Sequence, residues 1–203
     1  MLPTKIVIAS QNAKKIIEMR RILEQANLDV EIVGTDEFPE LEDVEETGST
    51  FADNAMLKAR AVSAATGFAA VGDDSGLCVD ALNGMPGILS ARWAGAHGND
   101  LANLELVLAQ ISHVPESRRG ASFVCAVAYA DPEGNEFIVE GSMSGMLIDQ
   151  PRGTNGFGYD PIFVPTGHVV TSAEMESDAK DAISHRGKAL KKFVAQLQTQ
   201  KSL

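Results

Sequence analysis

The spacing of apolar residues near the start of the chain predicts a strand, a tight loop and a helix. The run Lys5–Ala9 is short and rich in β-branched residues, as is typical of a buried strand. After Asn12 the apolar residues recur at helical spacing, at Ile16, Met19, Leu23 and Ala26. A second strand is expected at residues 30–33.

A capped helix and a strand are predicted next. Thr50 and Asp53 have the spacing of a capping box, so we expect a helix from there to Gly67, after an acidic linker at residues 36–46. The apolar run 68–72 reads as a buried strand. We expect it to stop at Asp73-Asp74-Ser75-Gly76, with residues 77–82 as a possible continuation, which would put carboxylates at a strand end.

The second half of the chain predicts a helix, a hairpin, a long loop and a final helix. Apolar positions of the first helix are Leu101, Leu104, Leu108 and Ile111. The hairpin joins residues 121–130 and 136–148, and the loop covers residues 149–160. The last helix opens at His185 and Arg186, with apolar positions Leu190, Phe193, Val194 and Leu197. The predicted class is therefore α/β with a mixed sheet.

Composition narrows the class of partner. With 203 residues and 44% hydrophobic composition the chain can bury a sizeable core, as one domain or one domain with a lobe. The 28 acidic residues exceed the 17 basic ones, giving a net charge of −11, which opposes binding to nucleic acid. A small anionic substrate would therefore need a local basic pocket or a metal.

The cysteines and the apolar runs give an expected location. Cys78 and Cys125 are far apart and form no CxxC pair, and the run 6–9 is too short for a signal peptide or a membrane span. We expect a cytoplasmic protein with reduced thiols and no membrane partner.

The loop after the first strand is the candidate phosphate site. Its residues are Ser10, Gln11, Asn12, Ala13, Lys14 and Lys15. At a strand-to-helix junction, backbone N–H groups and the helix dipole favour an anion, and the two lysines can reach outer phosphates. The alternative is a capped surface helix with solvated lysines. The GxxxxGK[ST] pattern of a P-loop is absent.

Asp73 and Asp74 are the candidate metal ligands. Adjacent carboxylates repel each other unless a cation or hydrogen-bond donors compensate. Magnesium suits such a site because it takes a few carboxylates together with phosphate oxygens, and Glu45 or Glu46 could supply a second ligand. Taken alone, Asp73-Asp74-Ser75-Gly76 is more often a plain turn, and Glu45 with Glu46 would be a solvated acidic loop.

An aromatic loop and a His-Arg turn are the candidate nucleobase site. Glycines surround Phe157 in Gly156-Phe157-Gly158-Tyr159-Asp160, so a base could stack on Phe157 while Asp160 accepts an N–H. The alternative is a structural loop whose aromatic residues fill the core. His185 and Arg186 place a cation at a helix start, where a purine O6 or a phosphate would compensate it, and Lys180 could add a contact. A surface His-Arg pair is the alternative.

Together these motifs resemble the inosine triphosphate pyrophosphatase family. The matching segments are Ile6–Ser10, Glu45–Phe51, Asn54-Ala55, Lys58–Arg60, Asp73–Leu77, Pro86-Gly87, Ser90–Arg92, Phe157–Pro161 and Ser184–Arg186. Their order and spacing extend over nearly the whole chain.

The resemblance implies a fold, a cofactor and roles for residues. It implies an elongated mixed α/β fold with two lobes around a cleft, and a homodimer. Phosphates would be held by Ser10–Lys15 and Lys58, and magnesium by Glu45 and Asp74. Asp74 would also be the general base, with Ser75 beside it. The remaining nucleotide contacts would come from Phe157, Gly158, Tyr159, Asp160, Lys180, His185 and Arg186. One departure is Gln11, where the family has glycine.

The implied activity is hydrolysis of non-standard purine nucleoside triphosphates (dITP, ITP and XTP) to the monophosphate and pyrophosphate. Two alternatives stay open. One is a nucleotide-sensing module that binds the same ligand without hydrolysis, and the other is a pyrophosphatase for modified pyrimidine nucleotides.

Overall fold

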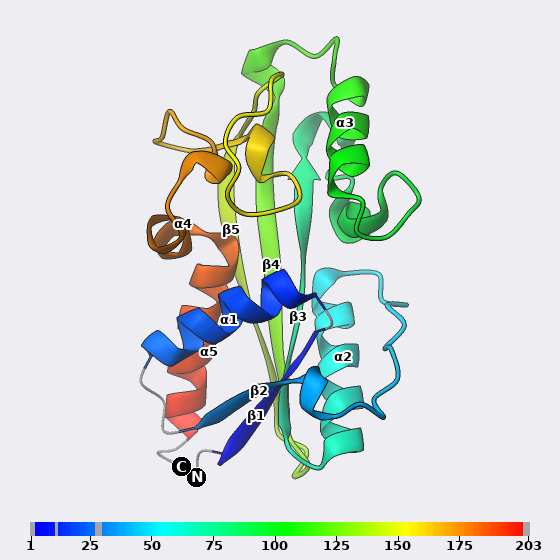
Figure 1. The fold of residues 1–203 in the computed structure, drawn as a ribbon, viewed down its shortest axis with the longest axis vertical. Coiled ribbons are helices and arrows are strands. Elements are labelled where there is room, and N and C mark those ends of the chain that lie inside the picture. Colours follow the sequence, from blue (N-terminus) through cyan, green and yellow to red (C-terminus); the bar gives the residue numbers. More distant parts are fainter. Residues whose placement is uncertain (1–2, 11, 27–29, 201–203) are drawn as a thin grey trace. The chain divides into compact units, whose positions relative to one another are not determined.

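The computed structural model describes residues 3–10, 12–26 and 30–200 (Figure 1). The helices are α1 (Ala13–Gln25), α2 (Phe51–Thr66), α3 (Asp100–Gln110), α4 (Ser177–Ile183) and α5 (His185–Gln200). The strands are β1 (Lys5–Ala9), β2 (Glu31–Gly34), β3 (Ala69–Val79), β4 (Gly120–Ala130), β5 (Glu136–Leu147) and β6 (Phe163–Pro165).

The chain forms two compact units. The first contains Met1–Asp74, Cys125–Gly141 and Arg186–Leu203, and the second contains Ser75–Val124 and Ser142–His185. The predicted description, one domain with two lobes, stays a prediction. Among the described residues, no helix combines the length and the apolar character needed to cross a membrane.

The described strands form a mixed six-stranded sheet in the order β2-β1-β3-β4-β5-β6. β1 pairs in parallel with both β2 and β3, whereas β6 pairs antiparallel to β5. The predicted mixed α/β class is therefore confirmed.

The core of the first unit explains why the β1 sequence is apolar at every position. Successive strand residues point to opposite faces. Ile6 and Ile8 pack with residues of α1 and α5, whereas Val7 packs with Val62 of α2. A parallel strand with both faces covered has no solvent-facing side, so alternation is lost. The same division holds on β4, where Ala126, Ala128 and Ala130 pack with α2.

The second unit has its own core. Leu77 and Val79 of β3 pack with Leu104 and Val107 of α3 and with Phe163 of β6. Apolar residues of β4 and β5 complete this cluster, including Phe123, Met143 and Leu147.

Local caps stabilise α1 and α2, two of the helices that were predicted correctly. Asn12 caps α1 by accepting from the backbone of Lys14 and Lys15, and Thr50 with Asp53 forms a complete capping box on α2. α2 ends at Gly67, whose φ of 71° is the left-handed conformation that glycine adopts readily. The hairpin, the long loop and the start of the last helix are also confirmed.

Three details of the prediction were wrong. β3 runs without interruption from Ala69 to Val79, so residues 73–76 lie inside a strand and do not end it. Leu101 is 64% exposed and does not belong to the apolar face of α3. The short elements α4 and β6 were not predicted, because seven and three residues carry too little periodicity.

The close packing of α2 on β3 gives a test of the fold. A Cβ at Gly72 would meet the backbone carbonyl oxygen of Ala55 and the backbone nitrogen of Ala59, which cannot rotate away. Gly72→Ala should therefore lower the free energy of unfolding by about 1–3 kcal/mol in urea denaturation. Ser144→Ala, at an exposed position of β5, is the control. Equal midpoints for Gly72→Ala and the parent would contradict this packing.

Candidate active site

The start of α1 brings together most of the predicted phosphate loop. The Asn12 side chain accepts from the backbone N–H groups of Lys14 (3.0 Å) and Lys15 (3.3 Å), and the Asn12 N–H donates to Ser10 Oγ (3.2 Å). Two of the backbone donors expected to face a phosphate are therefore used by the cap in this structure. The Lys14 and Ala13 positions are exposed, and Gln11 lies outside the described residues.

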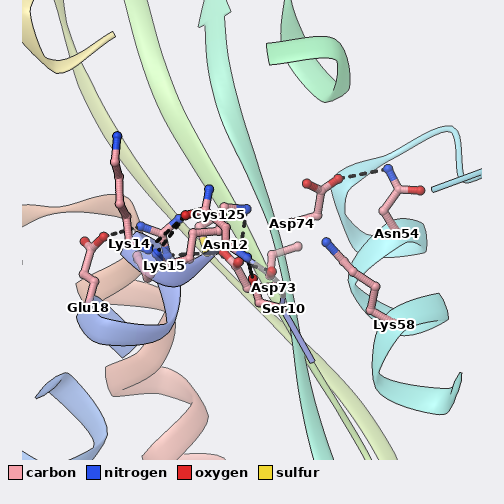
Figure 2. A network of polar contacts seen from close by, with 12 residues as sticks. Ser10, Asn12, Lys14, Lys15, Glu18, Asn54, Lys58, Asp73, Asp74 and Cys125 are labelled. Atoms are coloured by element: carbon pink, nitrogen blue, oxygen red, sulfur yellow. Dashed lines mark hydrogen bonds and ion pairs between the residues drawn. The ribbon is translucent and has the colours of Figure 1, made fainter. Parts of the chain in front are cut away.

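Asp73 is the centre of a buried ionic network in the first unit (Figure 2). Its Oδ1 lies 3.1 Å from Lys15 Nζ, and its Oδ2 lies 3.2 Å from Arg186 Nε. Arg186 Nη1 in turn lies 2.6 Å from Glu18 Oε2 on α1. The Cys125 thiol also donates to Asp73 Oδ2, over 3.5 Å.

The electrostatics of this network keep Asp73 ionised. Burial alone would raise the pKa of Asp73, but the charges of Lys15, Arg186 and Lys58 hold it far below its ordinary value. Burial together with the Asp73 charge raises the pKa of the Cys125 thiol well above its ordinary value. The thiol therefore stays protonated and acts as a hydrogen-bond donor.

Asp74 projects from the opposite face of β3, toward α2. Figure 2 shows it turned toward Asn54 and Lys58, whereas Asp73 lies beside Lys15. The Asn54 side-chain amide donates to Asp74 Oδ2 over 2.9 Å. Burial raises the pKa of Asp74 against the opposing effect of Lys58 and Lys15, so this carboxyl is a stronger base than an exposed aspartate.

Lys58 carries the positive charge beside Asp74. It lies one helical turn after Asn54, so the two side chains share a face of α2. Its Nζ contacts Glu46 Oε1 at 2.9 Å. Burial lowers the pKa of Lys58, but the charges of Asp73, Asp74 and Glu46 outweigh this effect and leave the pKa raised. Lys58 therefore remains an ammonium ion.

The expected repulsion between Asp73 and Asp74 is relieved within the protein. Neighbouring strand residues face opposite sides, and each side supplies its own partner, Lys15 with Arg186 for Asp73 and Asn54 for Asp74. Cationic side chains and a hydrogen-bond donor thus compensate the two carboxylates, as the sequence allowed, and the magnesium site stays a prediction.

The second unit contains the aromatic loop, which we define as residues 156–159. Asp160 is buried, and its Oδ2 accepts both the Phe157 N–H (2.9 Å) and the Lys180 ammonium (2.6 Å). Lys180 Nζ also lies 5.6 Å from the centroid of the Phe157 ring. Asp160 therefore organises Phe157 and Lys180 in this structure, whereas the sequence predicted that it accepts an N–H from a base.

Contacts with other elements of the second unit hold the rest of the aromatic loop. The Gly158 N–H donates to Asp100 Oδ2 over 3.1 Å, and the Tyr159 hydroxyl donates to the Ser90 carbonyl over 2.8 Å. Tyr159 is buried, and burial followed by the Asp100 charge raises its pKa. Its hydroxyl is thus a neutral donor.

His185 and Arg186 belong to different units. In the second unit the His185 ring is buried and stacks on Phe123 of β4, with centroids 4.9 Å apart and an interplanar angle of 13°. In the first unit Arg186 is only 1% exposed and lies in the network with Asp73 and Glu18. Ser75, directly after Asp74 on β3, is half-buried.

Comparison with known proteins decides the family. The model of the Ham1 family matches residues 6–196. This chain belongs to the Ham1 family. It is 56% identical over 191 residues to a protein of Streptomyces avermitilis named dITP/XTP pyrophosphatase, which covers 94% of this chain and 96% of that protein.

Solved structures of Ham1 family proteins agree with this assignment. A crystal structure of the Mycobacterium abscessus nucleoside-triphosphatase, or dITP/XTP pyrophosphatase, is 55% identical and has a TM-score of 0.76, covering 93% of this chain and 98% of that one. A HAM1 protein of Coxiella burnetii is 42% identical and has a TM-score of 0.86, covering 98% and 100% of the two chains. The resemblance inferred from the motifs is thus confirmed.

The residues of this Ham1 chain can be tested for their fit to magnesium. Among the described residues, no group of three or more His, Cys, Asp or Glu side chains could hold a metal ion. Magnesium needs less than this, because it retains waters and takes one or two carboxylates with substrate phosphates. Asp74 and Glu46 both lie near Lys58, whereas Glu45 is exposed. These residues therefore fit a magnesium site that is shared with substrate phosphates.

Several residues that shape the site were not recognised from the sequence. Asn54 lies in one of the matching segments, but its contact with Asp74 was not predicted. Its spacing of four from Lys58, which places both side chains on one face of a helix, was the available signal. Glu18 also gave a signal, because it is a carboxylate among the core positions of α1, where a buried charge needs a partner. Asp100 and Phe123 gave none, because only the fold brings them to Gly158 and His185.

The buried network should contribute strongly to stability. Asp73→Asn would remove the carboxylate that Lys15 and Arg186 share, although Arg186 keeps its pair with Glu18, and removing one partner of a buried pair costs about 3–5 kcal/mol. Urea denaturation at neutral pH would measure the loss. The matched control is Glu136→Gln, which breaks the exposed pair with Arg60 and should shift the midpoint little. Similar shifts for both variants would show that burial does not set the strength of these pairs.

Proposed function

We propose that this chain hydrolyses non-standard purine nucleoside triphosphates (dITP, ITP and XTP) to the monophosphate and pyrophosphate, which clears them from the nucleotide pool. The observation that carries the proposal is Asp74, a buried carboxylate with a raised pKa, oriented by Asn54 and accompanied by Lys58. Membership of the Ham1 family and relatives named dITP/XTP pyrophosphatase support the substrate class.

The triphosphate is assigned to the cations at α1 and α2. The overall charge of −11 repels an anion, so binding depends on local positive charge. Lys14 and Lys15 lie at the α1 start, where the helix dipole adds to their charge, and Lys58 lies beside Asp74. Ser10 and Asn12 supply polar groups at the same place. Gln11 is part of this assignment by resemblance.

Asp74 is assigned as the general base. A water oxygen bonds to the α-phosphorus as the bond from that phosphorus to the bridging oxygen breaks, and Asp74 takes the proton of the water. Pyrophosphate leaves with the electrons of the broken bond. The hydrogen bond from Asn54 fixes the orientation of the carboxylate, and Lys14, Lys15 and Lys58 stabilise the charge that builds on the leaving group.

Magnesium is the proposed cofactor. Asp74 with Glu46, or with Glu45 as the resemblance implies, would hold it together with phosphate oxygens. When bound, magnesium supplies charge neutralisation at the phosphates and lowers the pKa of a bound water.

Contacts with the nucleobase are assigned to residues of the second unit, and Arg186 is added to them by resemblance. Phe157 offers a ring for stacking, and Lys180 and His185 offer polar groups. Gly158, Tyr159 and Asp160 shape the loop, and Ser75 is included by resemblance. A homodimer is proposed from the family resemblance, and a cytoplasmic location from the cysteine spacing and the short apolar run at residues 6–9.

Asp74→Asn should abolish turnover while sparing binding, because asparagine keeps the shape but cannot take the proton. We expect the rate of pyrophosphate release from dITP to fall at least about a hundredfold. Titration of dITP against the variant should still give saturable binding. Asp80→Asn, at an exposed aspartate, serves as the control. A parental rate for Asp74→Asn would refute its role. No pyrophosphate from dITP, ITP or XTP with the parent and magnesium would favour a sensing module.

Selectivity against ATP follows from hydrogen-bond polarity. Hypoxanthine and xanthine present O6 as an acceptor and N1–H as a donor, and adenine presents the reverse pattern. Protein groups that are fixed to pair with O6 and N1–H find no partner on adenine. The kcat/KM for ATP should therefore be at least about a hundredfold below that for ITP. A panel of triphosphates in the pyrophosphate assay measures this ratio, and comparable values for ATP and ITP would contradict the account.

A further inference from the structure

The aromatic loop adopts a conformation that needs support from outside the loop. Gly156 and Gly158 have φ values of 73° and 61°, so the backbone is left-handed on both sides of Phe157. Glycine loses more conformational freedom on ordering than any other residue. Such a loop keeps one conformation only where other groups hold it.

Three hydrogen bonds supply that support, and one of them comes from a distant rigid element. Asp160 holds the Phe157 N–H from within the following turn, and the Ser90 carbonyl holds the Tyr159 hydroxyl. Asp100 holds the Gly158 N–H across a separation of 58 residues. It therefore ties the loop to α3.

The position of the Asp100 carboxylate is fixed by α3, which is packed in the core and capped. Leu104 and Val107 of the helix are buried in the core of the second unit. Asn99 caps the helix by accepting from the backbone of Ala102 over 3.2 Å, and Asp100 is the first helical residue. A carboxylate in the first turn is stabilised by the helix dipole, so its charge is favoured there before any substrate binds.

The bond acts directly on the ring proposed to stack on the base. The Gly158 N–H belongs to the peptide that follows Phe157, so fixing that peptide fixes one side of the Phe157 backbone while Asp160 fixes the other. With both sides held, the direction of the Phe157 Cα–Cβ bond, from which the ring extends, is fixed.

We propose that Asp100 is a positioning residue for nucleobase recognition, which holds the Gly158 N–H so that the Phe157 ring is presented for stacking. The inference rests on the stacking role given to Phe157 in the proposed function. Asp100 does not touch the reacting phosphates in this account, so its effect falls on KM and leaves kcat nearly unchanged.

Steady-state kinetics on dITP would test this role with matched variants. Asp100→Ala should raise KM about fivefold to tenfold, as expected for loss of one hydrogen bond to a charged group, with kcat within about twofold of the parent. Asp100→Asn keeps an oxygen acceptor and should recover most of the loss. Asn99→Ala is the structural control, because it removes the cap of the same helix without a bond to the loop. It should lower Tm and leave KM at the parental value.

A double-mutant cycle with Phe157→Ala links Asp100 to the ring. If Asp100 acts through Phe157, Asp100→Ala should raise KM no further when Phe157 is already alanine. Independent effects in the cycle, a parental KM for Asp100→Ala, or an equal rise for Asn99→Ala would each overturn the inference. A parental KM for Phe157→Ala would instead overturn the stacking role itself, and with it the basis of the inference.

Discussion

The structure depends on how two neighbouring carboxylates are buried in one strand. Removing a carboxylate from water is costly unless ion pairs and hydrogen bonds compensate. β3 meets this constraint by alternation, since Asp73 faces Lys15 and Arg186 and Asp74 faces Asn54. On the first side the charges of Lys15 and Arg186 hold the pKa of Asp73 far below its ordinary value, whereas burial on the second side raises the pKa of Asp74. One position therefore stabilises the unit, and the next retains a basic carboxylate for chemistry.

Carboxylates also hold the aromatic loop of the second unit. A buried carboxylate, Asp160, joins the Phe157 backbone to Lys180, and Asp100 joins the Gly158 backbone to α3. In both units, carboxylates that the sequence suggested as ligand contacts form ion pairs and hydrogen bonds within the protein. They are Asp73 in the first unit and Asp160 in the second. The residues assigned to substrate contact are therefore placed by a surrounding set of polar residues, and several of these were not recognised as functional from the sequence.

Local signals account for what the sequence predicted well. The capping box at Thr50 and the apolar run of β1 depend only on neighbouring residues, and both predictions were confirmed. The continuity of β3 could not be predicted, because Arg186, which compensates Asp73, lies 113 residues away. For the same reason, the sequence could not show that Asp100 contacts Gly158 or that Arg186 is buried beside Asp73. The contact between Glu46 and Lys58 was not predicted either, because it too depends on the fold.

The division of roles on β3 is tested most directly by the free energy of unfolding of Asp74→Asn. This should be measured at neutral pH without nucleotide or magnesium, beside the parent. Because the pKa of Asp74 is raised, its charge opposes folding at neutral pH, and asparagine can still accept from Asn54. The account predicts that Asp74→Asn is at least as stable as the parent. A loss of several kcal/mol, the size expected on breaking a buried ion pair, would show that Asp74 is a structural carboxylate like Asp73 and would contradict the account.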